Sequence, residues 1–168
     1  MDALNSNVSK IIAINRRRIG LDPADPKADQ LFSNSSGAAT RLCVYGRMRP
    51  GGPDGHALEP LGGKWVTCSY PGHLQNGGQC SLDECPGLGW TMTREWNEGG
   101  YLLTADALGK NWDKLDLKEG GNYARLLTPV RVDGIEAVAN IYVSRNASEA
   151  QLMMLDGMNV HDEVDFWL

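Results

Sequence analysis

The chain has no long run of apolar residues and no excess of positively charged residues. No stretch of its 168 residues approaches the apolar length of about 18 that a membrane-spanning helix needs. The N-terminal segment also lacks the apolar core of a secretory signal, because polar side chains between Asn5 and Lys10 interrupt it. With 16 Lys and Arg against 21 Asp and Glu, the net charge of −5 disfavours binding to duplex nucleic acid. We therefore expect a cytoplasmic protein with no membrane and no nucleic-acid partner.

Cysteine is also scarce, with four in the chain. Without an export signal, free thiols are expected rather than a disulfide framework, and Cys43 is expected in the core. The other cysteines occur with a histidine in a glycine-rich region, in the order Cys68, His73, Cys80 and Cys85. Four such ligands could hold zinc, although the closely spaced Cys-x-x-Cys pair of structural zinc sites is missing. We predict no metal and no cofactor, with this cluster as the alternative.

Glycine, in contrast, is abundant. The 20 glycines exceed the usual share of about 7%, which favours short strands joined by turns over a helical bundle. The length fits one domain, or one domain with an appendage. Hairpin signals outnumber helix signals, so the pattern predicts either an α+β domain or a partly closed barrel.

The first forty residues have the pattern of a helix followed by an arm. Apolar residues at helical spacing predict a short amphipathic helix over residues 2–18, ending before Gly20. Its last turn holds Arg16–Arg18, expected to be a solvated end that offsets the helix dipole, or alternatively to contact phosphate. Residues 21–40 have too few apolar side chains for a packed element and are predicted to form a flexible linker or arm. The helix must pack on its own domain or on a second copy, so a homodimer through this arm is one expectation.

The remaining chain alternates strand and turn signals. We predict an irregular excursion over residues 71–87 that covers the substrate, and a C-terminal helix that is capped around Ser148 and ends at Gly157. The expected domains are residues 1–40 (helix and arm), 41–145 (main domain) and 146–168 (C-terminal helix and tail). The other predicted elements are strands over 41–45, 64–70, 125–132 and 135–143, a hairpin of 88–96 with 101–105 around Asn97–Gly100, a short helix over 112–117, and a turn at Asp133-Gly134.

Two stretches carry chemistry. In the first, the strand over residues 41–45 breaks into a Gly/Pro/Arg-rich loop, and Gly46 allows a positive φ that leaves successive N–H groups pointing one way. Such a row of donors suits a carboxylate or a developing oxyanion, although an ordinary turn is the simpler alternative. The second stretch runs from Trp112 to Arg125 and contains Glu119.

Together these stretches resemble the gamma-glutamylcyclotransferase-like family. The run from Tyr45 to Gly51 (YGRMRPG) matches its first motif, and Leu115 to Gly120 (LDLKEG) followed by Tyr123 and Arg125 matches its second. The resemblance covers residues 41–143 and does not include the first forty. It implies a small mixed β-barrel of about six strands with short flanking helices, and a site in a cavity at the end of the first strand.

The resemblance also implies a reaction and the residues that carry it. The family releases an amine from a gamma-glutamyl amide by attack of the glutamyl α-amine on the side-chain carbonyl, which closes 5-oxoproline. By resemblance, Glu119 is the general acid/base, and its pKa should be raised by burial. The backbone of Tyr45, Gly46, Arg47 and Met48 would hold the glutamyl end. Tyr123 and Arg125 would orient the base or meet a carboxylate. The expected partner is thus a small gamma-glutamyl amine or peptide, with no cofactor.

The same residues also allow simpler interpretations than the roles that the resemblance implies. Glu119 could be a surface acid, Tyr123 could only pack, and Arg125 could face water. Many relatives carry a small residue at the position of Arg47, so its long cation could recruit an acidic substrate or fill the pocket. The alternative function is therefore a catalytically silent relative that binds a ligand or a protein.

Overall fold

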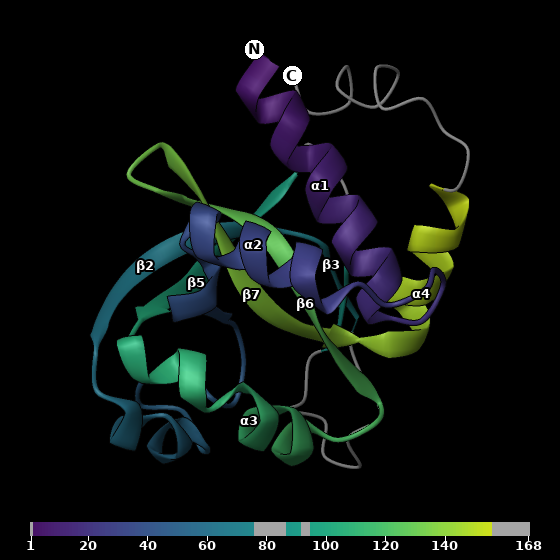
Figure 1. The fold of residues 1–168 in the computed structure, drawn as a ribbon. Helices are drawn as coiled ribbons and strands as arrows, with labels where there is room; N and C mark the ends of the chain where they lie inside the picture. Colours follow the sequence, from purple (N-terminus) through teal and green to yellow (C-terminus); the bar gives the residue numbers. More distant parts are fainter. Residues whose placement is uncertain (1, 76–86, 92–94, 156–168) are drawn as a thin grey trace.

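A closed, mixed β-barrel forms the centre of the protein (Figure 1). The computed structural model describes residues 2–75, 87–91 and 95–155. Strand β7 runs parallel to β1, and the other paired barrel strands are antiparallel. This confirms the predicted α+β class and the mixed barrel, which is closed by five strands. Around the barrel the strands are β1 (Arg41–Val44), β5 (Trp96–Thr104), β2 (Lys64–Pro71), β6 (Tyr123–Val132) and β7 (Ile135–Ser144).

Short helices flank the barrel. The helices α1 and α4 contact each other, whereas α3 lies at the bottom of the view in Figure 1. No helix in the described part of the chain is long and apolar enough to cross a membrane. The α-helices are α1 (Asp2–Arg18), α2 (Pro26–Ser36), α3 (Trp112–Glu119) and α4 (Arg145–Met154), and the short 3-10 helices are η1 (Ala38–Thr40), η2 (Gly55–Ala57), η3 (Glu59–Leu61) and η4 (Asp106–Lys110).

The hairpin of β6 and β7 forms where the sequence predicted it. The strands pair without interruption from Tyr123 opposite Ser144 to Val132 opposite Ile135. At the turn, Asp133 has φ 51° and Gly134 has φ 77°, the positive values that a two-residue hairpin turn requires. Local turn chemistry was sufficient to predict this hairpin.

The predicted hairpin around Asn97–Gly100 is wrong. These residues lie within one continuous strand, β5, which pairs with β2 along its length. Cys68 pairs with Gly100 and Tyr70 with Asn97, so the register shifts at this point and the strand bulges. A glycine at positive φ, here Gly99 at 82°, suits a β-bulge as well as a turn.

Helix α1 is fixed to the barrel by a buried asparagine. The Nδ2 of Asn15 donates to the carbonyl of Leu127 at 2.9 Å, and its Oδ1 accepts from the Leu127 N–H at 2.7 Å. The indole N–H of Trp90 donates to the same carbonyl at 2.9 Å. Asn15 thus satisfies backbone groups of β6, while Ile11 and Ile14 bury the apolar face of the helix within the chain itself.

The prediction that residues 21–40 form a flexible linker or arm is wrong. They form α2 and η1, and Phe32 and Ala38 are buried in the core. The side chain of Asp25 caps α2 by accepting from the Ala28 N–H at 3.1 Å. Gly37, in the left-handed conformation, ends the helix. Capping at both ends and two buried side chains compensate for the low apolar content.

The sequence predicted that the arginines at the end of α1 would be solvated, and this prediction is wrong for Arg16 and Arg18. The side chains of Arg16 and Arg18 are only 11% and 12% exposed. Arg16 pairs with Asp22 at 2.8 Å and donates to the carbonyl of Leu152 at 2.7 Å. Arg18 pairs with Asp29 on α2 at 2.7 Å. Both cations therefore join elements of the fold, and neither is positioned as an open phosphate site.

The C-terminal helix begins earlier than predicted. Helix α4 starts at Arg145, and Ser148 lies fully buried inside it rather than at its cap. The Ser148 hydroxyl accepts from the Trp90 N–H at 2.9 Å. The predicted stop at Gly157 lies outside the described residues.

Part of the predicted irregular excursion is a small sheet. Strand β3 (His73–Gln75) pairs antiparallel with β4 (Gly87–Gly89). The prediction that this excursion covers the substrate falls on residues 76–86, outside the described chain, as do Cys80 and Cys85. Cys68 is buried with its sulfur 3.8 Å from that of Cys43, and both are free thiols. In the part of the chain that the structure describes, no group of three or more metal-ligating side chains gathers.

Candidate active site

A cavity of about 270 Å³ opens where β1 runs into its following loop. Ligand pockets usually measure about 300–1,000 Å³, so this cavity suits a small molecule. Its walls come from segments far apart in the sequence, because the barrel brings the end of β1 next to α3. The lining residues are 42–48, Asp54, Lys118, Glu119, Tyr123 and Tyr142.

The loop after β1 is tightly wound. Gly46 has φ 140°, as its predicted role in the turn required, and its carbonyl accepts from the N–H of Arg49 at 3.1 Å. The carbonyl of Arg47 accepts from the Asp54 N–H at 2.9 Å. A Cβ on Gly52 would lie 2.5 Å from that Arg47 oxygen, so only glycine fits there. Among the described residues, the N–H groups of Gly46 and Met48 have no hydrogen-bond acceptor. The loop therefore offers amide donors at the cavity wall.

Glu119 is the last residue of α3 and lines the same cavity. Burial raises the pKa of its carboxyl, Lys118 opposes that shift, and the nearby carboxylates of Asp54 and Asp116 add to it. The negative end of a helix dipole also disfavours a charged acid at this position. Glu119 makes no hydrogen bond or ion pair with any described residue. Its carboxyl group is thus suited to accept and return a proton.

One turn earlier on α3, Asp116 anchors the helix to the barrel. Arg125 on β6 pairs with Asp116 through Nε at 2.9 Å and Nη2 at 3.3 Å. The hydroxyl of Tyr142 on β7 donates to Asp116 at 2.7 Å. The Arg125 guanidinium also lies 4.5 Å from the centre of the Trp112 ring and donates to Asn140 at 3.0 Å. These contacts fix the end of α3, and with it Glu119, against two strands.

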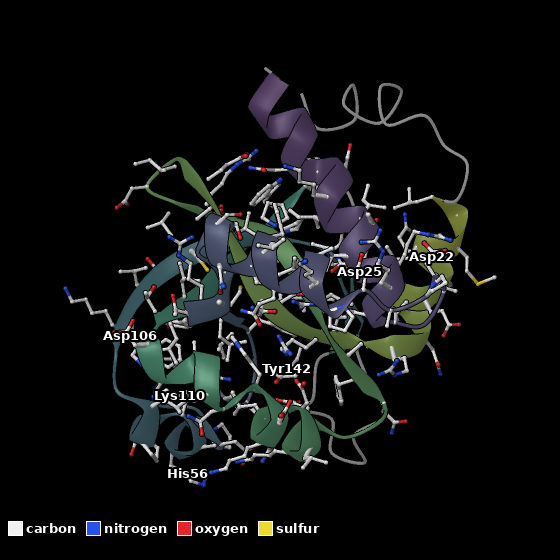
Figure 2. The ribbon with its side chains drawn as sticks, in the orientation of Figure 1. Asp22, Asp25, His56, Asp106, Lys110 and Tyr142 are labelled. Carbon is white, nitrogen blue, oxygen red and sulfur yellow. The ribbon has the colours of Figure 1, made fainter. Side chains whose placement is uncertain are left out.

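Tyrosines form the uncharged wall of the cavity. The hydroxyl of Tyr45 donates to the backbone carbonyl of Tyr142 at 2.6 Å. Burial raises the pKa of both phenols well above their ordinary value, so they stay neutral. Figure 2 shows Tyr142 beside α3, whereas His56 lies at the edge of the molecule and is exposed.

Arg47 does not fill the cavity. Its Nε donates to Asp54 Oδ2 at 2.7 Å, and this hydrogen bond holds the pKa of Asp54 below its ordinary value. The cavity keeps its 270 Å³ with Arg47 among its lining residues. Arg47 and Asp54 are therefore joined twice, by this ion pair and by the hydrogen bond from the Asp54 N–H to the Arg47 carbonyl. Both contacts hold the two ends of the loop together.

Six of the seven residues predicted for the site line one cavity. They are Tyr45, Gly46, Arg47, Met48, Glu119 and Tyr123, and the exception is Arg125, which meets Asp116 instead.

Sequence reasoning missed Asp54, Asp116, Lys118 and Tyr142 as residues at or beside the site. The helical spacing between Asp116 and Glu119 was a usable signal, since residues three apart share a helix face. Asp54 and Tyr142 carried no comparable signal.

Comparison with known proteins gives structural likenesses only. No protein-family model matches the sequence, and no curated protein does. A solution structure from Arabidopsis thaliana is 19% identical, with 64% of this chain and 69% of that chain covered and a TM-score of 0.46. The crystal structure of an AIG2-like protein from Mus musculus is 17% identical, with 67% and 82% covered and a TM-score of 0.47. A second Arabidopsis thaliana solution structure is 18% identical, with 67% and 66% covered and a TM-score of 0.40.

Proposed function

We propose that the protein is a gamma-glutamyl cyclotransferase that releases 5-oxoproline and a free amine from a small gamma-glutamyl amine or peptide. One observation carries the proposal. Glu119, a half-buried carboxyl group with a raised pKa, shares a small cavity with the amide donors of the Gly46 loop. The ordered motifs that resemble the gamma-glutamylcyclotransferase-like family lie at these two places.

The cavity favours a reaction in which the substrate supplies its own nucleophile. Among the described lining residues there is no serine, threonine or histidine. A hydrogen bond with the Cys68 thiol and burial raise the pKa of Cys43, so its sulfur stays a neutral thiol. Of the two carboxyl groups in the lining, Asp54 is paired with Arg47, which leaves Glu119 as the base. A site with one available carboxyl base and no activated nucleophile suits intramolecular attack, because ring closure needs orientation more than a covalent intermediate.

The steps follow from this arrangement. Glu119 takes a proton from the α-ammonium of the glutamyl part, and the freed amine attacks the side-chain carbonyl. The new C–N bond closes the ring, and negative charge moves to the carbonyl oxygen. The N–H groups of Gly46 and Met48 would stabilise that charge. Glu119 then gives its proton to the departing nitrogen as the original amide bond breaks. The ring nitrogen loses its second proton through the same carboxyl group, so the products are the neutral lactam of 5-oxoproline and the amine as its ammonium form. No water is consumed and no cofactor takes part.

The other predicted residues act around this step. Tyr45 and Tyr123 shape the pocket, while the backbone from Tyr45 to Met48 holds the glutamyl end. Arg125 positions α3 through Asp116 rather than meeting a carboxylate of the substrate.

Turnover is favoured over a catalytically silent relative by the contacts of Arg47. A silent binder was expected if Arg47 filled the pocket. Its Nε instead donates to Asp54 at 2.7 Å. The room that a glutamyl group needs is left open.

Release of 5-oxoproline tests the proposal. The purified protein is incubated with gamma-glutamyl amines and peptides, and 5-oxoproline is quantified by mass spectrometry. We expect Glu119→Gln to lower kcat by about 100-fold or more, the usual contribution of a general acid/base. Glu59→Gln, at an exposed position on η3 that does not line the cavity, is the matched control and should leave kcat unchanged. Absence of product with every compound, or full activity in Glu119→Gln, would contradict the proposal.

A further inference from the structure

Some of the charged side chains that line the cavity have an ion-pair partner, and others do not. Arg47 and Asp54 neutralise each other in an ion pair of 2.7 Å. Glu119 is half-buried, lies next to Lys118 in the chain and forms no ion pair with any described residue. Lys118 also lines the cavity, is exposed, and makes no hydrogen bond or ion pair with any described residue. Among the described residues that line the cavity, Lys118 is therefore the cation that no carboxylate holds in an ion pair.

The neighbouring carboxylates leave the Lys118 ammonium available. Consecutive helix residues point roughly 100° apart, so Lys118 and Glu119 do not face each other on α3. Lys118 lowers the pKa of Asp54 at a distance, but the hydrogen bond to that carboxylate comes from Arg47. The ammonium is therefore near both acids and bonded to neither.

We propose that Lys118 selects substrates whose departing half carries a carboxylate or another anionic group. This inference rests on the proposed function. In the proposed reaction the glutamyl end lies against the Tyr45–Met48 loop and the reacting amide lies at Glu119. The departing nitrogen then lies beside the end of α3, where Lys118 directly precedes Glu119. An anion on the departing half would pair with the ammonium, and a cation would be repelled by it. The favoured substrate class is gamma-glutamyl amino acids or peptides rather than gamma-glutamyl diamines.

Three matched compounds test this specificity. They are gamma-glutamylalanine, its neutral C-terminal amide, and gamma-glutamylputrescine, whose departing half is cationic. The protein should turn over the anionic compound with a kcat/KM about fivefold above that of the neutral one, the effect of one partly exposed ion pair. The cationic compound should be slowest, and added salt should reduce the differences.

Variants of α3 separate this effect from general electrostatics. Lys118→Gln should abolish the preference for the anionic compound, and Lys118→Glu should reverse the order of the anionic and cationic compounds. Lys114→Glu makes the same charge change at an exposed position of the helix that does not line the cavity. It should keep the order of the wild-type protein. An unchanged order in Lys118→Glu would overturn the inference.

A binding measurement keeps the inference separate from the proposed reaction. The same three compounds are titrated by calorimetry into Glu119→Gln and into Glu119→Gln with Lys118→Glu. A preference for the anionic compound that reverses with Lys118→Glu supports the role of Lys118 even if no variant makes 5-oxoproline, in which case only the proposed reaction is wrong. Equal affinities in both backgrounds, or no binding of any compound, overturn the inference.

Discussion

Asp116 and Glu119 lie one turn apart on α3 and have opposite surroundings. Asp116 accepts hydrogen bonds from Arg125 at 2.9 Å and from Tyr142 at 2.7 Å. Glu119 has no hydrogen-bond partner among the described residues, and its pKa is raised by burial. Asp116 therefore has a structural role and is held in place, whereas Glu119 lines the cavity and has a raised pKa.

The raised pKa of Glu119 should make its ionisation destabilising. A carboxyl group whose folded pKa exceeds its unfolded value binds more protons in the folded state, so stability falls as pH rises from the unfolded pKa through the folded one. Glu119→Gln removes that loss. We expect its melting temperature to exceed that of the wild-type protein at about pH 8. The difference should vanish near about pH 3, below the ordinary glutamate pKa of about 4.3, where the carboxyl group is protonated in both states. Thermal denaturation across this range measures it, and an advantage that grows toward acid pH would contradict the assigned shift.

Loss of Asp116 should loosen the end of α3. Asp116→Ala leaves the Arg125 guanidinium and the Tyr142 hydroxyl without their shared acceptor, which should cost about 1–3 kcal/mol of unfolding free energy. The rate of 5-oxoproline formation should fall too, because Glu119 loses its position. Asp113→Ala, at an exposed position of the same helix, should change stability by less than about 0.5 kcal/mol. Urea denaturation of both variants checks this, and equal effects would show that Asp116 anchors nothing.

The attachment of α1 should depend on Asn15. In Asn15→Ala the N–H of Leu127 loses its acceptor in the buried interior, and we expect a loss of about 1–3 kcal/mol in unfolding free energy. Asn7→Ala lies on the exposed part of the same helix and is the control. Chemical denaturation measures both, and a difference below about 0.5 kcal/mol would indicate that α1 is held by its apolar face alone.

The shape of the loop after β1 should depend on Gly52. A Cβ there would meet the Arg47 carbonyl at 2.5 Å, so Gly52→Ala must shift the loop that carries the amide donors. We expect kcat/KM to fall by about tenfold or more, since small displacements of positioning groups cost that much. Gly109→Ala, where no atom lies within 4 Å of the new Cβ, should leave kcat/KM unchanged. If the two variants have the same activity, the loop geometry does not control turnover.

The sequence predicted those parts of the fold that local chemistry determines. Asp133 and Gly134 define their turn by themselves, and the strands on both sides followed from it. The same reasoning failed at Asn97–Gly100, because whether a glycine at positive φ makes a turn or a bulge depends on the register with β2. Helix α2 was missed because the low apolar content of residues 21–40 predicted a linker, whereas Asp25 and Gly37 cap the helix at its two ends.

The residues of the candidate site were also predicted where a local motif contains them and missed where tertiary contacts place them. Gly46 and Glu119 were predicted because each stands in an ordered motif of the sequence. Arg125 was placed in the pocket, but it meets Asp116, a partner that only the packing of α3 on β6 reveals. Asp54 and Tyr142 reach the cavity through tertiary contacts, and their sequence neighbours give no indication of it.

Oxygen isotope labelling during turnover tests the central claim most directly. The protein is incubated with a gamma-glutamyl substrate in water enriched in oxygen-18, and the products are analysed by mass spectrometry. Intramolecular ring closure predicts free amine and 5-oxoproline, the latter without label, because no water attacks the carbonyl. Formation of glutamate that carries oxygen-18 would mean hydrolysis instead and would contradict the proposed mechanism, as would recovery of the substrate unchanged.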